Sequence, residues 1–445
     1  MDFVSKPKQT LSVVDAISII VGMVVGVGIF KTPSIVASSV NSEETLILLW
    51  LLGGVASFIG ALCYAELASA HPHAGGDYHY LQKAFGNTPS FLYAWARITI
   101  IQTGSIAMVG FIIGDYASEM MSLGPYSASL YAAFSIILLT SVNIAGIKQG
   151  KWTQKMFVVL IMIGLFIVMV IGFFIGAPQE VGRTERIISK TAWGKAMIFV
   201  LLTYGGWNEA SFLSAEVRSV RRNMVRVLIY SIGIVMLIYL LINMALLRIL
   251  GVSGMAASGA VMADLMYNTF GLQGTRFISL LILLAALSTL NAAIITGART
   301  SYALGRDYSL LNFFGRWEGK RNTPVNALLL QGCIALLLVI LGAGTRDGFV
   351  TMVEYTAPVF WLFSLMVGTS IFILRYKKPV VSRPFSVHFY PLTPFFFCSV
   401  CAFMLYSSLM YTGRGSLIGI GVLITGIPFM IINRMCIKDE TKELK

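Results

Sequence analysis

Long apolar runs separated by short clusters of charged residues occupy almost all of this 445-residue sequence. Inside a bilayer, every backbone N–H and C=O group must find its partner within the protein, so only helices and closed barrels span it. The runs are about 20 residues long, which is the length that a transmembrane helix needs. The alternating pattern of barrel strands is absent. The sequence therefore predicts an all-α integral membrane protein.

Composition and charge support this prediction. Hydrophobic residues make up 57% of the chain and charged residues 12%, with a mean hydropathy of +0.79; a soluble protein carries about twice this charged fraction. The net charge of +13 does not indicate a nucleic-acid partner, because the basic residues lie in alternate loops. No small-residue cleavage site precedes the first run, so we expect no cleaved signal peptide. The five cysteines imply no disulfide framework.

The apolar runs predict twelve membrane spans. Most of the 33 lysine and arginine residues fall in the connections on the N-terminal side of the membrane. Because such residues favour the cytoplasmic side, we predict cytoplasmic termini and a location in the inner or plasma membrane of the cell. The predicted spans are 12–37, 46–68, 90–114, 127–147, 155–177, 196–215, 226–249, 276–304, 325–343, 349–374, 392–412 and 415–433.

The first span contains a glycine-rich stretch that disfavours a continuous helix. Gly22, Gly26 and Gly28 lie within seven residues, and Pro33 follows. Unwound backbone at this depth persists only where it lines a cavity or is buried in protein. Its free N–H groups can hold an anion and its free C=O groups a cation, which predicts half of a binding site for a small zwitterion. A close helix contact lined by glycine is the alternative.

The sixth span contains a similar interruption, where Gly205 and Gly206 follow Thr203 and Tyr204. Breaks in the first and sixth spans predict two inverted repeats of five helices plus two peripheral helices. Such repeats place two broken helices together at the bilayer midplane, as in many secondary transporters. The pair of breaks favours the binding site over simple packing. The predicted divisions are residues 1–177, 178–375 and 376–445.

Several motifs resemble those of the amino acid–polyamine–organocation superfamily, and most closely its L-type amino acid transporter branch. The resemblance covers nearly the whole chain. It implies alternating-access transport of L-α-amino acids by a permease, working as a symporter or an antiporter, rather than an enzyme. The motifs are Gly26-Val27-Gly28-Ile29-Phe30 with Pro33, Gly75-Gly76-x-Tyr78, Asn143-x-x-Gly146, Tyr204-Gly205-Gly206-Trp207-Asn208 and Arg383-Pro384-Phe385.

The resemblance also implies how the substrate binds. The carboxylate would accept hydrogen bonds from backbone N–H groups after the first break, and the ammonium would donate to carbonyl groups at both breaks. Leu202 stands where the family usually has a gating aromatic residue, so Tyr204 or Trp207 is expected to take that role. The expected substrate-binding residues are Val24, Gly26, Val27, Gly28, Leu202, Thr203, Tyr204, Gly205, Trp207 and Glu209.

Two charged residues follow the breaks, Lys31 in the first span and Glu209 in the sixth. Charges within spans are costly and usually functional. One hypothesis is that they form an ion pair that joins the two half-helices. The other is that Glu209 faces the substrate side chain and shapes selectivity. Arg97 in the third span and Glu354 in the tenth are alternative structural or gating partners.

A sodium ion is the one cofactor that the sequence suggests. Ile161 replaces a lysine that many sodium-independent relatives carry in span five. The resemblance to sodium-coupled folds implies five oxygen ligands, which such a cation favours. The alternatives are that Ser288 and Thr289 bond helix carbonyls, with proton coupling or uncoupled exchange. An ion channel is a remote alternative, and no obligate protein partner is evident. The five ligand residues are Gly22, Val25, Ala285, Ser288 and Thr289.

Overall fold

The computed structural model describes residues 9–175, 191–308, 311–343, 348–411 and 419–431. Within these ranges the chain is helical, and strand-like pairing is limited to two isolated bridges. The α-helices are α1 (Val13–Val24), α2 (Gly28–Ala37), α3 (Glu43–Ala70), α4 (Asp77–Phe85), α5 (Asn87–Ala96), α6 (Gln102–Met120), α7 (Ser127–Ala145), α8 (Ile147–Val170), α9 (Thr191–Thr203), α10 (Ala210–Leu213), α11 (Val220–Ala257), α12 (Val261–Asp307), α13 (Val325–Ala343), α14 (Gly348–Lys377) and α15 (Leu392–Tyr411). Two π-helical turns, η1 (Arg97–Ile101) and η2 (Ile171–Ile175), and one 3-10 turn, η3 (Trp207–Glu209), complete them.

The helices agree with the predicted spans in type and approximate position. In the described residues, nine helices are long and apolar enough to cross a membrane, and the bent pair α1 and α2 makes a tenth span. The predicted sixth span corresponds to the shorter pieces α9, η3 and α10. The predicted twelfth contains the short apolar helix Gly419–Ile431. The all-α membrane fold is therefore confirmed, whereas the number twelve stays a prediction.

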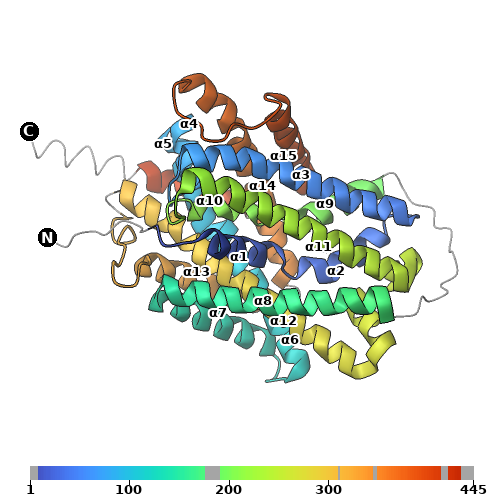
Figure 1. The fold of residues 1–445 in the computed structure, drawn as a ribbon. Helices are drawn as coiled ribbons and strands as arrows, with labels where there is room; N and C mark the ends of the chain where they lie inside the picture. Colours follow the sequence, from blue (N-terminus) through green and yellow to red (C-terminus); the bar gives the residue numbers. More distant parts are fainter. Residues whose placement is uncertain (1–8, 176–190, 309–310, 344–347, 412–418, 432–445) are drawn as a thin grey trace, which may run out of the picture.

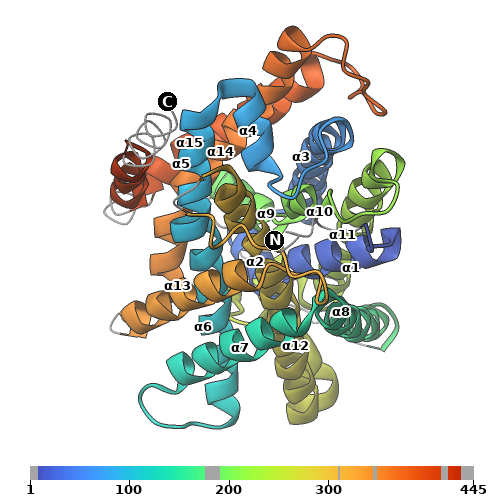
Figure 2. The same cartoon turned by 90° about the vertical axis from the view of Figure 1, so that its left-hand side faces the viewer.

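The helices form one elongated bundle (Figure 1). We call the end at which α1 begins the inner end, following the orientation that the charges predict, and the end at which α2 finishes the outer end. The inner end lies on the left of Figure 1 and faces the viewer in Figure 2, where α2 and α9 lie near the middle of the bundle. The short helix α4 lies across the inner end.

The first span is broken where the glycines predict. At the start of α1, Ser12 and Asp15 form a capping box, in which each side chain accepts the other residue's backbone N–H. The helix ends at Val24, and α2 starts at Gly28 with its axis turned by 45°. The intervening residues leave backbone groups free of helical hydrogen bonds.

The second break follows α9 and lies against the first. Gly206 has φ +103°, a left-handed conformation that L side chains rarely adopt. A Cβ added to Gly206 would lie 2.7 Å from Cγ of Met23, in the last turn of α1. Glycine therefore allows both the turn and the close approach of the two broken helices.

The connection at 250–275, between the predicted seventh and eighth spans, is largely helical. Gly251 (φ +60°) bends the outer end of α11, and Gly271 (φ +57°) bends α12. Short helical pieces therefore lie between the two kinks. The connection at about 178–195, between the predicted fifth and sixth spans, lies mostly outside the described residues.

Candidate substrate-binding site

Backbone N–H groups at the start of α2 form one side of the site. Within the described part of the chain, the N–H groups of Val27 and Gly28 donate to no acceptor, as is usual for the first residues of a helix. Both residues are half-buried. The partial positive charge at the helix start adds to these donors. This edge is suited to a carboxylate.

Backbone carbonyl groups from both breaks form the other side. Tyr239 of α11 is fully buried, and its hydroxyl donates to the carbonyl oxygen of Val24 at 2.7 Å and of Thr203 at 3.2 Å. These carbonyls are two of those predicted to hold an ammonium group, so they already face a donor. Gly205, by contrast, donates its N–H to the carbonyl of Leu202 at 3.0 Å.

Sequence reasoning missed Tyr239. It lies in an apolar run of the seventh span, without a glycine or a charge beside it. The available signal was weak: a buried tyrosine hydroxyl usually needs a hydrogen-bond partner. Its partner carbonyls come from other helices, far away in the sequence.

Tyr239→Phe is expected to destabilise the substrate-free protein by about 1–3 kcal/mol, because two buried carbonyls lose their donor. A bound amino acid would then supply the missing donor through its ammonium group. We therefore expect a saturating amino acid to raise the melting temperature of the variant more than that of the wild type. Equal shifts in both proteins would contradict the assignment of these carbonyls to the ammonium group.

The three side chains considered for gating differ in exposure. Leu202 is 47% exposed at the end of α9, whereas Tyr204 and Trp207 are buried. The ring of Tyr204 packs at 6.0 Å from Trp50 and 5.0 Å from Tyr239, measured between centroids. In this conformation, therefore, both candidate rings contribute to the core. The gating role of Tyr204 or Trp207 stays a prediction.

The proposed pair of Lys31 and Glu209 is wrong in this structure. Glu209 binds Arg97 of η1, with 2.5 Å between Oε2 and Nη2, and both side chains are buried. Lys31 is exposed and makes no ion pair with any residue that the structure describes. Lys31 lies on an exposed part of α2, whereas Glu209 is buried. The alternative partner, Arg97, takes its place.

A second buried carboxylate, Asp77, lies beside this ion pair. Asp77 begins α4 and accepts hydrogen bonds from Tyr64 at 3.1 Å, Tyr93 at 3.2 Å and Ser211 at 3.0 Å. Burial raises the pKa of Asp77 to about 7, although the Arg97 guanidinium and the hydroxyl donors act in the opposite direction. Ser211 lies in α10, so Asp77 joins the inner end to the second broken helix.

Asp77 is expected to make stability fall as the pH rises. Its pKa is about 7 in the folded protein against an ordinary value of 3.8, so the folded state binds more protons than the unfolded chain between these two pH values. The contribution of Asp77 to the free energy of unfolding is therefore fully present below about pH 4 and is lost as the pH rises through 7. The test is the melting temperature of wild type and Asp77→Asn between pH 5 and 8. The difference in melting temperature between the two proteins separates the effect of Asp77 from that of nearby histidines, which both proteins contain. A difference that does not change with pH would contradict the assigned pKa of Asp77.

The residues of the predicted sodium site come together only in part. The hydroxyls of Ser288 and Thr289 donate to the carbonyl of Gly22 at 3.3 and 3.2 Å. The alternative to a sodium site is that these two hydroxyls bond helix carbonyls, and this is the arrangement observed. Gln154 donates its side-chain N–H to Ser288 Oγ at 2.8 Å, so a nitrogen donor occupies the side on which a cation needs oxygen. These contacts accommodate the Gln154 amide better than a sodium ion, and the sodium ion stays a prediction.

Ion pairs and a backbone contact join elements at the inner end. Glu216, after α10, binds Arg299 of α12 through two hydrogen bonds of 2.6 and 3.0 Å, and both side chains are buried. Beside them, Leu11 pairs with Val217 in a parallel bridge. Asp15 of α1 contacts Lys151 and Lys155 of α8.

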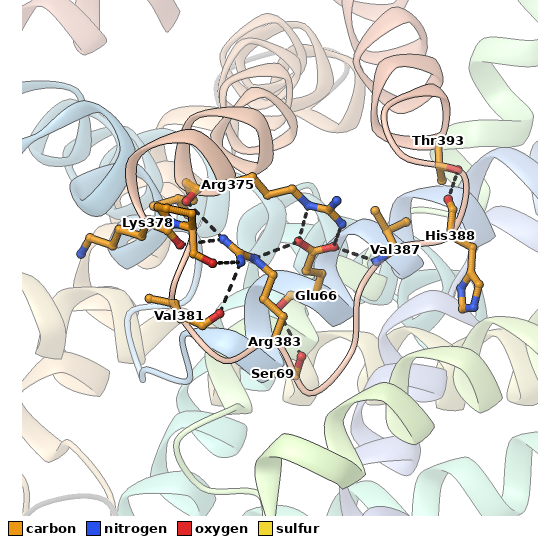
Figure 3. A network of polar contacts seen from close by, with 11 residues as sticks. Glu66, Ser69, Arg375, Lys378, Val381, Arg383, Val387, His388 and Thr393 are labelled. Atoms are coloured by element: carbon orange, nitrogen blue, oxygen red, sulfur yellow. Dashed lines mark hydrogen bonds and ion pairs between the residues drawn. The ribbon is translucent and has the colours of Figure 1, made fainter.

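A further carboxylate, Glu66, ties α3 to the connection before α15. Figure 3 shows Glu66 between Arg375 and Arg383. Arg375 donates to both carboxylate oxygens at 2.9 and 2.6 Å, and the backbone N–H of Val387 adds a bond of 2.7 Å. Charge-assisted pairs of this bidentate kind fix the orientation of both groups. Glu66 and Glu216 therefore each join the inner end of one helix to an arginine of another.

Two broken helices that meet inside an all-helical membrane bundle, with main-chain donors and acceptors at the breaks, are typical of a class of small-molecule carriers. The comparison with known proteins is specific. The chain belongs to the amino acid permease family, which it matches over residues 11–432. The fold and the family are those that the sequence motifs predicted, and the family consists of transporters, not enzymes.

Curated relatives are amino acid transporters. The chain is 26% identical over 393 residues to the b(0,+)-type amino acid transporter 1 of Mus musculus, covering 85% of this chain and 79% of that protein. It is 27% identical over 455 residues to the large neutral amino acids transporter small subunit 2 of Mus musculus, covering 98% and 84%. The human protein of that name is 27% identical over 433 residues, covering 95% and 79%. These relatives agree with the L-type branch.

Proposed function

We propose that this protein carries L-α-amino acids with neutral side chains across the membrane by alternating access. The observation that carries the proposal is the meeting of unbonded N–H groups at Val27 and Gly28 with the carbonyl edge at Val24 and Thr203. A carboxylate and an ammonium group on one carbon match these two edges. Such main-chain recognition accepts any α-amino acid.

The preference for neutral side chains follows from the charges near the breaks. The Glu209 carboxylate is neutralised by Arg97, so it does not offer a free charge to a basic substrate side chain. The printed name of one group of relatives, large neutral amino acids transporter, agrees with this preference. Glu209 acts in this view as a structural charge, and direct contact with substrate is the second hypothesis.

The conformation supports a cycle in which the inner end opens second. Buried ion pairs close the inner end, while Leu202 at the end of α9 is exposed. We propose that both termini are cytoplasmic, that the site faces outward in this state, and that the protein lies in the cell membrane. Some relatives are named as small subunits, but we propose that this chain transports without a protein partner.

Uptake of labelled amino acids into liposomes that contain the purified chain alone tests this function. A carrier gives saturable uptake that is accelerated by unlabelled amino acid on the opposite side. We expect neutral amino acids to compete and lysine or glutamate to compete weakly. Conductance without saturation would indicate the ion-channel alternative, and an absence of uptake by the isolated chain would contradict the proposal that it works alone.

Sodium coupling is the second candidate for the mechanism. It is favoured by the position of Ser288 and Thr289 against Gly22. The Gln154 donor at the same place favours uncoupled transport instead. Initial uptake rates with sodium replaced by potassium or choline, at fixed pH and clamped potential, decide between them. Unchanged rates would exclude sodium coupling.

A further inference from the structure

A row of three buried amide side chains runs between helices at the inner half of the bundle. Asn143 of α7 donates to Asn291 Oδ1 of α12 at 2.8 Å. Asn291 in turn donates to Gln154 Oε1 of α8 at 2.9 Å, and Gln154 donates to Ser288 Oγ at 2.8 Å. Ser288 then donates to the carbonyl of Gly22, which lies in α1 just before the break. All three amides are buried.

Two backbone carbonyls fix the direction of this amide row. Asn143 Nδ2 also donates to the carbonyl of Leu139 at 2.8 Å, and Asn291 Nδ2 to that of Gly150 at 3.2 Å. A carbonyl oxygen only accepts, so the NH₂ ends of both asparagines are determined. Asn291 must then meet the oxygen of Gln154, which leaves the NH₂ group of Gln154 facing Ser288.

Turning the Gln154 amide over would carry a penalty. Its NH₂ group would face the NH₂ group of Asn291, and two buried donors would lose their acceptors. Leaving a buried polar group without its partner is costly. The row therefore presents a hydrogen-bond donor, never an acceptor, toward the first broken helix.

Glycine at position 22 makes this contact possible. A Cβ there would overlap Gln154 Nε2 and lie 2.5 Å from Ser288 Oγ. The Gly22 carbonyl accepts from both Ser288 and Thr289. Gln154, α12 and the start of the first break are thus in direct contact.

We propose that the Gln154 carboxamide takes the place of a bound cation, holding the first broken helix against α12 by its positive NH₂ end and so positioning the substrate-binding break. This proposal rests on the proposed transport function. Gln154 is a positioning residue, because it acts through Ser288 and Gly22 and not on the substrate. Because the amide is a side chain of α8, it stays at this place, whereas a sodium ion would bind and dissociate.

Gln154→Glu and Gln154→Met test this role against the wild type. In Gln154→Glu, a carboxylate would face Ser288 and the Gly22 carbonyl in place of a donor. We expect uptake in choline at pH 8 to fall about tenfold, as the loss of about 1.4 kcal/mol implies. Sodium, or protonation at pH 5.5, should restore it, because either one returns positive charge or a donor to this place. Methionine has neither an amide nor a carboxylate, so in Gln154→Met uptake should fall under all conditions.

Charged groups nearby are already engaged. On the facing helix α1, Asp15 pairs with Lys151 and Lys155 of α8, so the carboxylate in Gln154→Glu has no free lysine from this group. Gln331→Glu is the matched control. Gln331 of α13 is also buried and also donates to a carbonyl of α12, that of Ile294, at 3.3 Å. It is no part of the amide row, so we expect no response to sodium in Gln331→Glu.

A binding readout keeps this test separate from the proposed function. Sodium should raise the melting temperature of Gln154→Glu and leave that of wild type unchanged, even if the chain transports a substrate other than an amino acid. Low pH should raise the melting temperature of Gln154→Glu by more than the rise that Asp77 alone gives the wild type. Sodium-dependent uptake or stabilisation in the wild type would overturn the inference. It would also be overturned by wild-type behaviour of Gln154→Met, or by a Gln154→Glu protein whose responses to sodium and pH equal those of wild type.

Discussion

Gly28→Val is expected to abolish amino acid uptake while leaving the protein folded and in the membrane. A Cβ at this position would already lie 3.0 Å from both Cγ2 and Oγ1 of Thr203, and valine adds two methyl groups to it. The branched side chain would cover the N–H edge at Val27 and Gly28 and push α2 away from α9. Because the carboxylate is held by main chain, no remaining side chain replaces the lost donors.

Uptake and substrate-induced stabilisation of purified Gly28→Val give the measurement. Gly233→Val is the matched control, because a Cβ at Gly233 of α11 meets no heavy atom within 4 Å. This control should transport normally. Uptake of normal affinity in Gly28→Val would remove the carboxylate site from the start of α2.

Arg97→Met is expected to cause the largest loss of stability among the charge substitutions, about 3–5 kcal/mol, because Glu209 is left buried without its partner. Arg97 also lies over the ring of Phe212, 3.7 Å from its centroid, so packing around the guanidinium is lost too. The double variant Arg97→Met/Glu209→Gln should recover much of this loss. Thermal unfolding of the single and double variants measures the coupling between the two residues.

Lys31→Met serves as the control for this pair. Lys31 is exposed, so its replacement should change stability by less than about 0.5 kcal/mol. A charge swap between Lys31 and Glu209 should accordingly give no rescue. Equal loss in Arg97→Met and in the double variant would contradict the assigned ion pair.

Sequence patterns predicted the parts of this protein that depend on local physical chemistry. Apolar length predicted the helices, and glycine content predicted the breaks, because backbone strain and burial act over a few neighbouring residues. The N–H edge at Val27 and Gly28 follows directly from the first break. These features needed no knowledge of which helices pack together.

Side-chain pairings across the bundle were less predictable. Lys31 and Glu209 each follow a break in the sequence, which suggested that they pair, but Glu209 binds Arg97 of the third span and Lys31 is exposed. Tyr239 and Asp77 have partners on helices distant along the chain. Gln154 lies between Thr153 and Lys155 in the sequence, and only the packed structure shows what it contacts.

The bridge between Leu11 and Val217 has a consequence for how such carriers diverge. It consists of two backbone bonds of 2.9 Å, from Leu11 N–H to the Glu216 carbonyl and from Arg218 N–H to the Leu11 carbonyl. If the inner end opens during transport, both bonds must break and re-form in every cycle. Since any residue other than proline supplies the same backbone groups, this latch places almost no restriction on residue identity. Related carriers can therefore keep these backbone hydrogen bonds without sharing a sequence motif there. Sequence comparison alone would not detect this part of the inner gate.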